Sequence, residues 1–129
     1  MIKDGVIVDT SALIDFLKNN EPNSATVEAL IKDKRLITTG IIIAELLQGV
    51  KSSNEETCVC NLVDGIPVIE LNSGLWLKAG KLSCSLRRKG ITLPLTDIAI
   101  ATLSIENNLS IFTLDKHFEQ VPGVILYRP

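Results

Sequence analysis

Short apolar runs alternate along this chain with longer segments in which apolar residues recur at helical spacing. Residues 6–8, Val-Ile-Val, have the β-branched composition of a strand covered on both faces, and the apolar residues of 12–17 then mark one face of a helix. Further strands are predicted at 36–38, 67–71, 110–113 and 124–127. Further helices are predicted at 27–31, 40–50, 54–64, 73–89 and 97–107. This alternation predicts an α/β fold with a mostly parallel sheet and helices on both of its faces.

Particular residues mark where these elements begin and end. Asn72 or Ser73 can cap the start of the longest helix, and Gly90 suits its C-terminal end. Thr96 is predicted to cap the next helix. Pro67 stands first in its strand, where the absence of an N–H group is tolerated.

The size and composition of the chain predict one domain, residues 1–129. Hydrophobic residues make up 46% of the 129 residues, enough to close a single core. No stretch approaches the roughly 18 continuous apolar residues of a membrane span, and the first residues show no signal-peptide pattern. Cys58, Cys60 and Cys84 are odd in number and lack the partners of a structural zinc site, which predicts reduced thiols. We therefore expect a cytoplasmic protein that does not associate with a membrane.

The net charge of −2 argues against broad electrostatic capture of nucleic acid. Basic residues nevertheless cluster at 32–35 and at Arg87-Arg88-Lys89. The second cluster is a candidate RNA-binding site, because cations there can contact phosphate groups. It can equally be a solvated helix end, where the helix dipole favours cations. Any polyanion must therefore bind to a local basic patch and not to the surface as a whole.

Four carboxylates stand where neither a core nor a surface pattern requires them: Asp9, Glu45, Asp97 and Asp115. Asp9 follows the first strand and Asp115 follows a later one, so both are predicted at the same carboxyl edge of a parallel sheet. Asp97 lies in the first turn of a very apolar helix. Glu45 lies inside an apolar helical segment, where an unpaired charge is costly to bury.

Each of these acids also has a purely structural interpretation. Asp9 can cap the following helix, Asp97 can be an ordinary helix-start residue, and Glu45 can form a salt bridge. Taken together, these structural interpretations are weaker than a shared catalytic role for the four acids. They do not explain why the chain lacks the other residues that usually form catalytic sites. The only histidine, His117, is interpreted as a solvated loop residue, and the sequence has no nucleophile elbow and no phosphate-binding glycine loop.

A cluster of carboxylates suits a hard cation. Mg²⁺ and Mn²⁺ prefer oxygen ligands, and crowded carboxylates need positive charge to offset their repulsion. Such a cluster predicts metal-assisted phosphoryl transfer.

Four short motifs carry the acids in a fixed order along the chain. They are Val6-Ile7-Val8-Asp9-Thr10-Ser11, Ala44-Glu45-Leu46, Leu95-Thr96-Asp97-Ile98-Ala99-Ile100-Ala101 and Phe112-Thr113-Leu114-Asp115. The ordered set resembles the PIN-domain family over nearly the entire chain, and in its compact length the chain is most similar to the VapC-like toxin ribonucleases of toxin–antitoxin pairs. Thr96 stands where the family often has Pro, and Ile98 where it often has Ala. Neither departure removes an acid.

The resemblance implies an α/β/α nuclease-like sandwich that cleaves RNA with a divalent metal, Mg²⁺ or Mn²⁺. Asp9 and Asp97 are then expected to be the principal metal ligands, with Glu45 and Asp115 at a second ion or its waters. Thr10, Ser11 and Thr113 are expected to cap or orient this cluster. The partners that the resemblance implies are a second copy of the chain, in a homodimer, and a VapB-like antitoxin that blocks the site.

Two other functions stay open from the residues alone. One is a PIN-like RNA-binding module that does not cleave, and the other is a metal phosphohydrolase that acts on DNA or small phosphate esters. Trp76 and Tyr127 could stack on a base, although packing in the core or at an interface is the expected role of such residues.

Overall fold

The computed structural model describes residues 4–129 of the chain. Its strands are β1 (Val6–Val8), β2 (Leu36–Ile37), β3 (Ser110–Phe112) and β4 (Ile125–Leu126). Its helices are α1 (Thr10–Leu17), α2 (Asn23–Lys32), α3 (Gly40–Gln48), α4 (Ser53–Asp64), α5 (Ser73–Arg88), α6 (Leu95–Glu106) and the 3₁₀ helix η1 (Lys116–Gln120).

The four strands form one parallel sheet in the order β2-β1-β3-β4. β1 occupies an inner position, and its three residues Val6, Ile7 and Val8 are fully buried, as the β-branched run predicts. Val8 is in register with Phe112 of β3, so the segments that follow β1 and β3 leave the sheet side by side. The predicted α/β class with a parallel sheet is confirmed.

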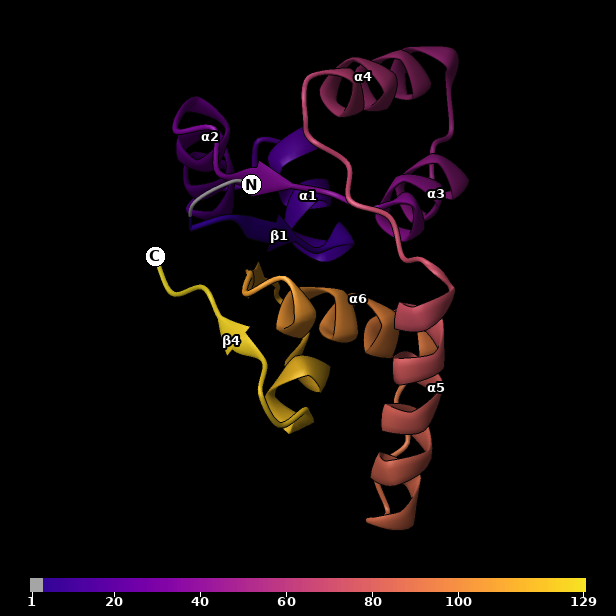
Figure 1. Ribbon diagram of the computed structural model, residues 1–129. Coiled ribbons are helices and arrows are strands. Elements are labelled where there is room, and N and C mark those ends of the chain that lie inside the picture. The colour runs from indigo at the N-terminus through magenta and orange to yellow at the C-terminus, as the bar shows by residue number, and fades with distance from the viewer. Residues whose placement is uncertain (1–3) are drawn as a thin grey trace.

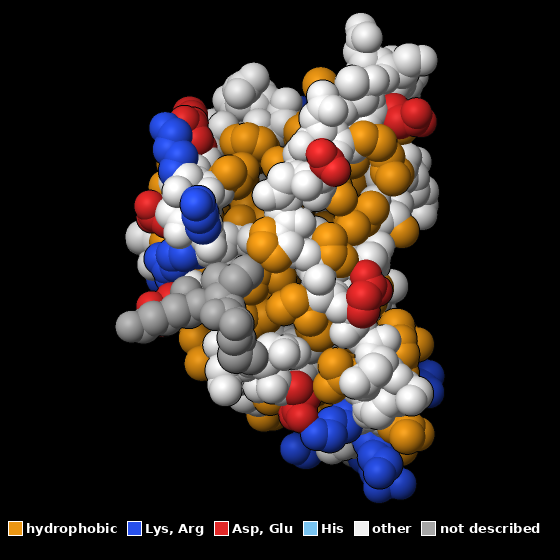
Figure 2. Space-filling view, turned by 45° about the horizontal axis from the view of Figure 1, so that its top comes forward, with side chains coloured by type: hydrophobic (Ala, Val, Ile, Leu, Met, Phe, Trp, Pro, Cys, Tyr) orange, Lys and Arg blue, Asp and Glu red, His pale blue; other side chains and the backbone are white. Residues whose placement is uncertain are grey.

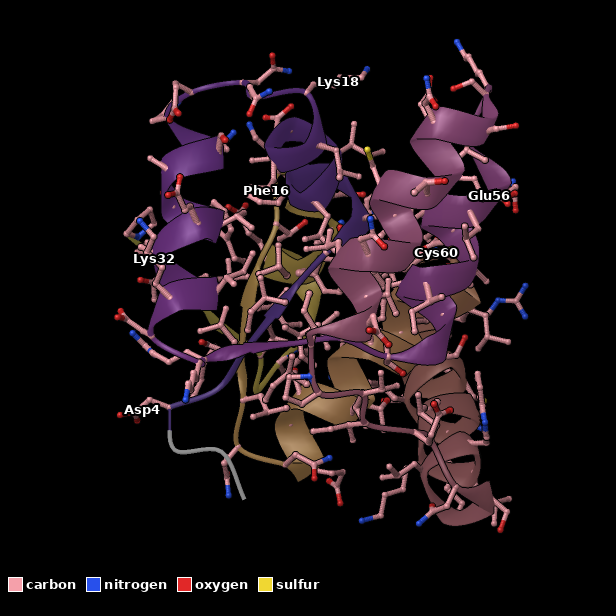
Figure 3. All side chains as sticks on the ribbon, turned by 90° about the horizontal axis from the view of Figure 1, so that it is seen from above. Asp4, Phe16, Lys18, Lys32, Glu56 and Cys60 are labelled. Carbon is pink, nitrogen blue, oxygen red and sulfur yellow. The ribbon has the colours of Figure 1, made fainter. Side chains whose placement is uncertain are left out.

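Helices cover both faces of the sheet. Figures 1 and 3 show α1 and α2 packed together on one face, with α6 on the other face and α5 beside it. In α6 every residue from Ile98 to Ser104 is buried. A helix that is apolar all round is therefore possible here, because the sheet and α5 enclose most of its circumference.

Two predictions about the secondary structure are wrong. Within the described residues, 67–71 form no strand, and only Val68 pairs with Thr38 in an isolated bridge. The reason is that β2 ends at Ile37 and the chain turns into α3 two residues after Thr38, which leaves no further backbone for a partner strand. Thr96 does not cap α6, because this helix begins one residue earlier, at Leu95, and no side chain caps it.

The boundaries of the longest helix are confirmed. The side chain of Asn72 accepts a hydrogen bond of 2.9 Å from the backbone N–H of Leu75, so it caps the start of α5. Gly90 follows the end of this helix with a φ of +82°, a left-handed conformation in which glycine is favoured. The other predicted elements are present with ends that differ by a few residues.

No helix within residues 4–129 combines the length and the apolar character needed to cross a lipid bilayer.

Candidate active site

Asp9 lies immediately after β1, at the N-cap position of α1, and its side chain is almost completely buried, with 6% exposed. Its carboxylate makes no capping hydrogen bond to the helix. Instead Oδ2 accepts hydrogen bonds from the hydroxyl of Thr113, at 2.9 Å, and from the hydroxyl of Ser11, at 3.3 Å. The helix-cap interpretation of Asp9 is therefore wrong, and the carboxylate is directed toward the end of β3.

Burial raises the pKa of Asp9 above its ordinary value of 3.8. The negative charges of Asp97 and Glu45 raise this pKa further, while the hydrogen bond from Thr113 lowers it. Asp97 and Glu45 thus each lie close enough to repel Asp9. A buried carboxylate among other acids is a centre of uncompensated negative charge.

The loop after β3 is tied to the start of α1 by hydroxyl groups. Thr113 Oγ1 accepts a 3.0 Å hydrogen bond from the backbone N–H of Asp115, and Ser11 Oγ accepts one of 3.1 Å from that of Leu114. The backbone N–H of Asp9 also donates to the carbonyl of Phe112, at 2.9 Å. Asp115 is therefore positioned relative to Asp9 by Thr113, which contacts both residues.

Glu45 reaches the site from α3, where it is half-buried. Its Oε1 accepts a 2.8 Å hydrogen bond from the hydroxyl of Thr10, the first residue of α1. Among residues 4–129 no salt bridge includes Glu45, so the salt-bridge interpretation is wrong. Thr10 therefore orients this carboxylate rather than capping its own helix.

Asp97 lies in the first turn of α6, and its side chain is only 14% exposed. His117 Nδ1 lies 3.0 Å from Asp97 Oδ2 and 3.2 Å from Asp115 Oδ2. One ligand-capable atom from each of these three residues lies within 4.8 Å of the others. The hydrogen bond to Asp97 is the main cause that raises the pKa of His117, and the charges of both acids raise it too.

The interpretation of His117 as a solvated loop residue is thus wrong. Asp115 caps η1 by accepting a 2.9 Å hydrogen bond from the backbone N–H of His117, and this tight turn brings the imidazole back over the acids. An Asp two residues before a His is the signal that could have indicated such a turn. It does not show which other acid the imidazole meets, because Asp97 comes from a different helix.

The basic cluster, Arg87-Arg88-Lys89, is exposed, and none of its residues is among the described contacts of the four acids. Arg87 and Arg88 end α5, which projects below the rest of the molecule in Figure 1. Figure 2 shows Lys and Arg side chains grouped at the lower end of the face that it displays. No salt bridge within residues 4–129 engages Arg87, Arg88 or Lys89.

The two large aromatic side chains differ in their surroundings. Tyr127 packs within the chain, edge-on against Phe112 at 6.0 Å between ring centroids and beneath the guanidinium of Arg35. Trp76 is 44% exposed and lines a shallow hollow on α5 together with the more exposed Leu77. The expected packing role is confirmed for Tyr127, whereas Trp76 lies at the surface.

The residues of this centre fit a divalent cation by their chemistry. Asp97 and Asp115 present carboxylate oxygens beside one another, and the buried Asp9 lies close enough to Asp97 for their charges to interact. Hard cations take such oxygens as ligands, and a positive ion would offset the repulsion that raises the pKa of Asp9. The hydroxyls of Thr10, Ser11 and Thr113 already hold Asp9 and Glu45 in place.

The parallel sheet, its covering helices and the acidic centre at its carboxyl edge define a protein of the nuclease-like α/β class. The model of the PIN domain family matches residues 6–124, and the chain belongs to this family.

Proteins similar to this chain include toxins and their complexes. A relative named ribonuclease VapC2, from Rickettsia felis, is 26% identical over 127 residues, which span 93% of this chain and 94% of the relative. The DNA-bound VapBC structure from Salmonella typhimurium has a TM-score of 0.82 at 20% identity and covers 97% of this chain and 98% of its own. The structure of a toxin–antitoxin complex from Klebsiella pneumoniae has a TM-score of 0.73 at 21% identity. It covers 97% of this chain and 100% of its own.

Proposed function

We propose that this protein is a divalent-metal-dependent endoribonuclease and the toxin of a toxin–antitoxin pair. The observation that carries the proposal is the buried carboxylate of Asp9, held by Thr113 and repelled by Asp97 and Glu45. Such a centre is unfavourable without a cation, and folding retains it only at a cost. Membership of the PIN domain family and the similarity to relatives named as ribonucleases support the reaction class.

We propose a separate role for each pair of acids. We assign Asp9 and Asp97 as the principal metal ligands, with Glu45 and Asp115 holding a second ion or its waters. A divalent ion bound there, Mg²⁺ or Mn²⁺, would lower the pKa of a water, align it with the scissile phosphodiester and stabilise the charge that develops on the phosphate.

The hydroxyl residues supply the positioning that this chemistry needs. Thr10 fixes the orientation of Glu45, and Thr113 links Asp9 to the backbone of Asp115. Ser11 contacts Asp9 and the loop that carries Asp115. The carboxylates are thereby preorganised, so that little rearrangement is needed when RNA binds.

The RNA backbone is expected to extend beyond the acids to the end of α5. Arg87, Arg88 and Lys89 are exposed there and engaged in no described salt bridge, so their charges are free to meet phosphates. They stand at the end of α5, the helix that projects below the rest of the molecule (Figure 1). We assign them to binding and not to catalysis.

The proposed protein partners are a second copy of the chain and a VapB-like antitoxin. The exposed apolar side chains of Trp76 and Leu77 on α5 support a homodimer, because a second copy would remove them from water. Leu95, 55% exposed, stands two residues before Asp97, and Leu114, 46% exposed, stands directly before Asp115. An antitoxin segment with apolar anchors and one basic side chain would therefore complement the site. We place this activity in the cytoplasm, where exposed cysteines such as Cys58 stay reduced.

RNA cleavage by the purified protein tests the proposed activity. Structured and single-stranded RNAs are incubated with Mg²⁺, Mn²⁺ or EDTA, and wild type is compared with Asp97→Asn and with the control Asp64→Asn, whose acid is exposed at the end of α4. We expect Asp97→Asn to keep the circular dichroism of the wild type and to lose about 100-fold or more in rate. Equal rates for a folded Asp97→Asn, turnover of DNA in preference to RNA, or RNA binding without cleavage would each contradict the proposal.

Expression in cells tests the toxin assignment separately. Wild type expressed alone should slow growth and create new RNA 5′ ends, while Asp9→Asn should do neither. Co-expression with the product of the neighbouring gene should restore growth, and the two proteins should copurify. Growth arrest that is equal for wild type and Asp9→Asn would refute the assignment.

A further inference from the structure

His117 brings a nitrogen into a centre that is otherwise built of oxygens. Its Nδ1 lies 3.0 Å from Asp97 Oδ2 and 3.2 Å from Asp115 Oδ2, so one nitrogen faces two acids that come from different elements. Nothing in the assigned roles of the four carboxylates uses this imidazole. The nitrogen is hydrogen-bonded to Asp97, and the same position would let it bind an ion that Asp97 holds.

The separation of these atoms matches that of ligands around one ion. Two ligands that occupy neighbouring octahedral positions, each about 2.1 Å from the metal, lie roughly 3.0 Å from each other. The distances from Nδ1 to Oδ2 of Asp97 and to Oδ2 of Asp115 are both near this value. The same three residues form the compact group whose ligand atoms lie within 4.8 Å of one another.

The placement of the imidazole is built into the backbone. Asp115 Oδ1 accepts the backbone N–H of His117, so the other oxygen of the same carboxylate remains directed at the ring. Phe118, the next residue, is 1% exposed and anchors η1 in the core. The turn therefore presents Nδ1 to the acids, although the side chain as a whole is 43% exposed.

We infer that His117 is a ligand, through Nδ1, of the ion that Asp97 holds, and that this nitrogen makes the site prefer Mn²⁺ to Mg²⁺. The inference rests on the proposed metal site. Mg²⁺ strongly favours oxygen ligands and gives up its waters reluctantly, whereas imidazole nitrogen is a good ligand for first-row transition ions. An imidazole nitrogen beside Asp97 therefore makes the site suit the transition ion better than carboxylates alone would.

Pulsed electron paramagnetic resonance of the wild-type protein with Mn²⁺ tests the ligation directly, without RNA and without a variant. A ¹⁴N nucleus bonded to Mn²⁺ gives a hyperfine modulation that a ring separated from the ion by a water does not give at the same strength. We expect the modulation of one directly bonded imidazole nitrogen. Its absence from the Mn²⁺-loaded protein would overturn the inference.

Calorimetric titration with Mn²⁺ and with Mg²⁺ tests the preference. His117→Asn keeps a polar side chain beside the acids but removes the imidazole, and Lys116→Asn changes the exposed neighbour in the same turn. We expect the ratio of Mn²⁺ to Mg²⁺ affinity to fall about tenfold or more in His117→Asn and to stay unchanged in Lys116→Asn. An unchanged ratio in a His117→Asn protein with wild-type circular dichroism would overturn the preference.

The failure of this inference can be told apart from the failure of the proposed function. Metal-dependent RNA cleavage by a wild type that shows no ¹⁴N modulation would overturn the role of His117 and leave the ribonuclease assignment intact. A strong modulation in a protein that cleaves no RNA would support the ligation and reject the ribonuclease assignment.

Discussion

The hydroxyl of Thr113 donates a 2.9 Å hydrogen bond to Oδ2 of Asp9 across a separation of 104 residues along the chain. The same oxygen of Thr113 accepts the backbone N–H of Asp115 at 3.0 Å. One small side chain thus sets the position of one acid and of the loop that carries another. It also lowers the pKa of Asp9, against the larger effect of burial.

Replacing Thr113 by Val should therefore impair the site while the fold is kept. Val has nearly the same shape but neither donates to Asp9 nor accepts from Asp115, so both carboxylates lose a fixed partner. We expect the rate of RNA cleavage and the affinity for Mn²⁺ each to fall by about tenfold to 100-fold. The measurement pairs cleavage rates with calorimetric titration, and Thr57→Val on exposed α4 serves as the control. Equal values for the two variants would contradict the role of Thr113.

Replacing Asp9 by Asn should stabilise the metal-free protein at neutral pH. Burial raises the pKa of Asp9 in the folded protein above 3.8, so between 3.8 and the raised pKa the folded protein binds more protons than the unfolded chain. The free energy of unfolding therefore falls as the pH rises through this window, and the loss persists above it. Asn carries no charge and avoids that loss.

Thermal melting in EDTA from pH 3 to pH 8 measures this effect. Asp9→Asn should melt above the wild type at neutral pH, and the difference should shrink as the pH falls toward 3.8, with Asp64→Asn as the control for removal of a solvated acid. Adding Mn²⁺ should raise the melting temperature of the wild type and leave Asp9→Asn nearly unchanged. A wild type that melts above Asp9→Asn in EDTA at neutral pH would show that the acid is not repelled.

The sequence was sufficient to predict that Asp9 and Asp115 leave a parallel sheet at the same carboxyl edge. That prediction rests on the β-branched run 6–8 and on the strand at 110–113, whose pairing is observed. It could not predict which residues hold the acids. The contact of Thr10 with Glu45, across 35 residues, depends on how α1 packs against α3, and no local pattern encodes that packing.

The errors at Thr96 and at 67–71 have a common origin. Thr96 has a good capping side chain, yet α6 begins at Leu95, so the threonine falls inside the first turn. Residues 67–71 have a suitable strand composition, yet β2 offers only a short edge for pairing. In both cases the local composition suited the predicted role, but the observed bounds of α6 and of β2 leave no place for that role.

Replacing Leu77 by Glu should yield a monomer if α5 forms the proposed dimer interface. Leu77 is 66% exposed beside Trp76, and a buried charge at the centre of an apolar contact is strongly unfavourable. Light scattering coupled to size-exclusion chromatography should give half the wild-type mass. Ile125→Glu on β4, where the native side chain is 64% exposed, should keep the wild-type mass. A dimeric Leu77→Glu protein would show that Leu77 is not part of the dimer interface.

Replacing Arg88 by Ala should weaken RNA binding without altering the cleavage step. The loss of one phosphate contact should reduce the slope of log affinity against log salt concentration by roughly one. Binding is measured with Asp97→Asn as the background, so that the RNA stays intact. Lys32→Ala, which removes a cation that is already paired with Glu28 on α2, should leave the slope unchanged. An unchanged slope for Arg88→Ala would show that Arg88 does not contact RNA and would favour the interpretation of this cluster as a solvated helix end.

The strand order has a consequence for a chain that is still being synthesised on the ribosome. β1 and Asp9 emerge early, but their neighbour in the sheet is β3, and Thr113 and Asp115 follow that strand. Nascent chains fold from the N-terminal side as they emerge. The edge of β1 that pairs with β3 therefore has no partner through most of translation. A partly made chain therefore holds no complete set of acids. The proposed ribonuclease site is therefore complete only after translation has passed β3 and the loop beyond it.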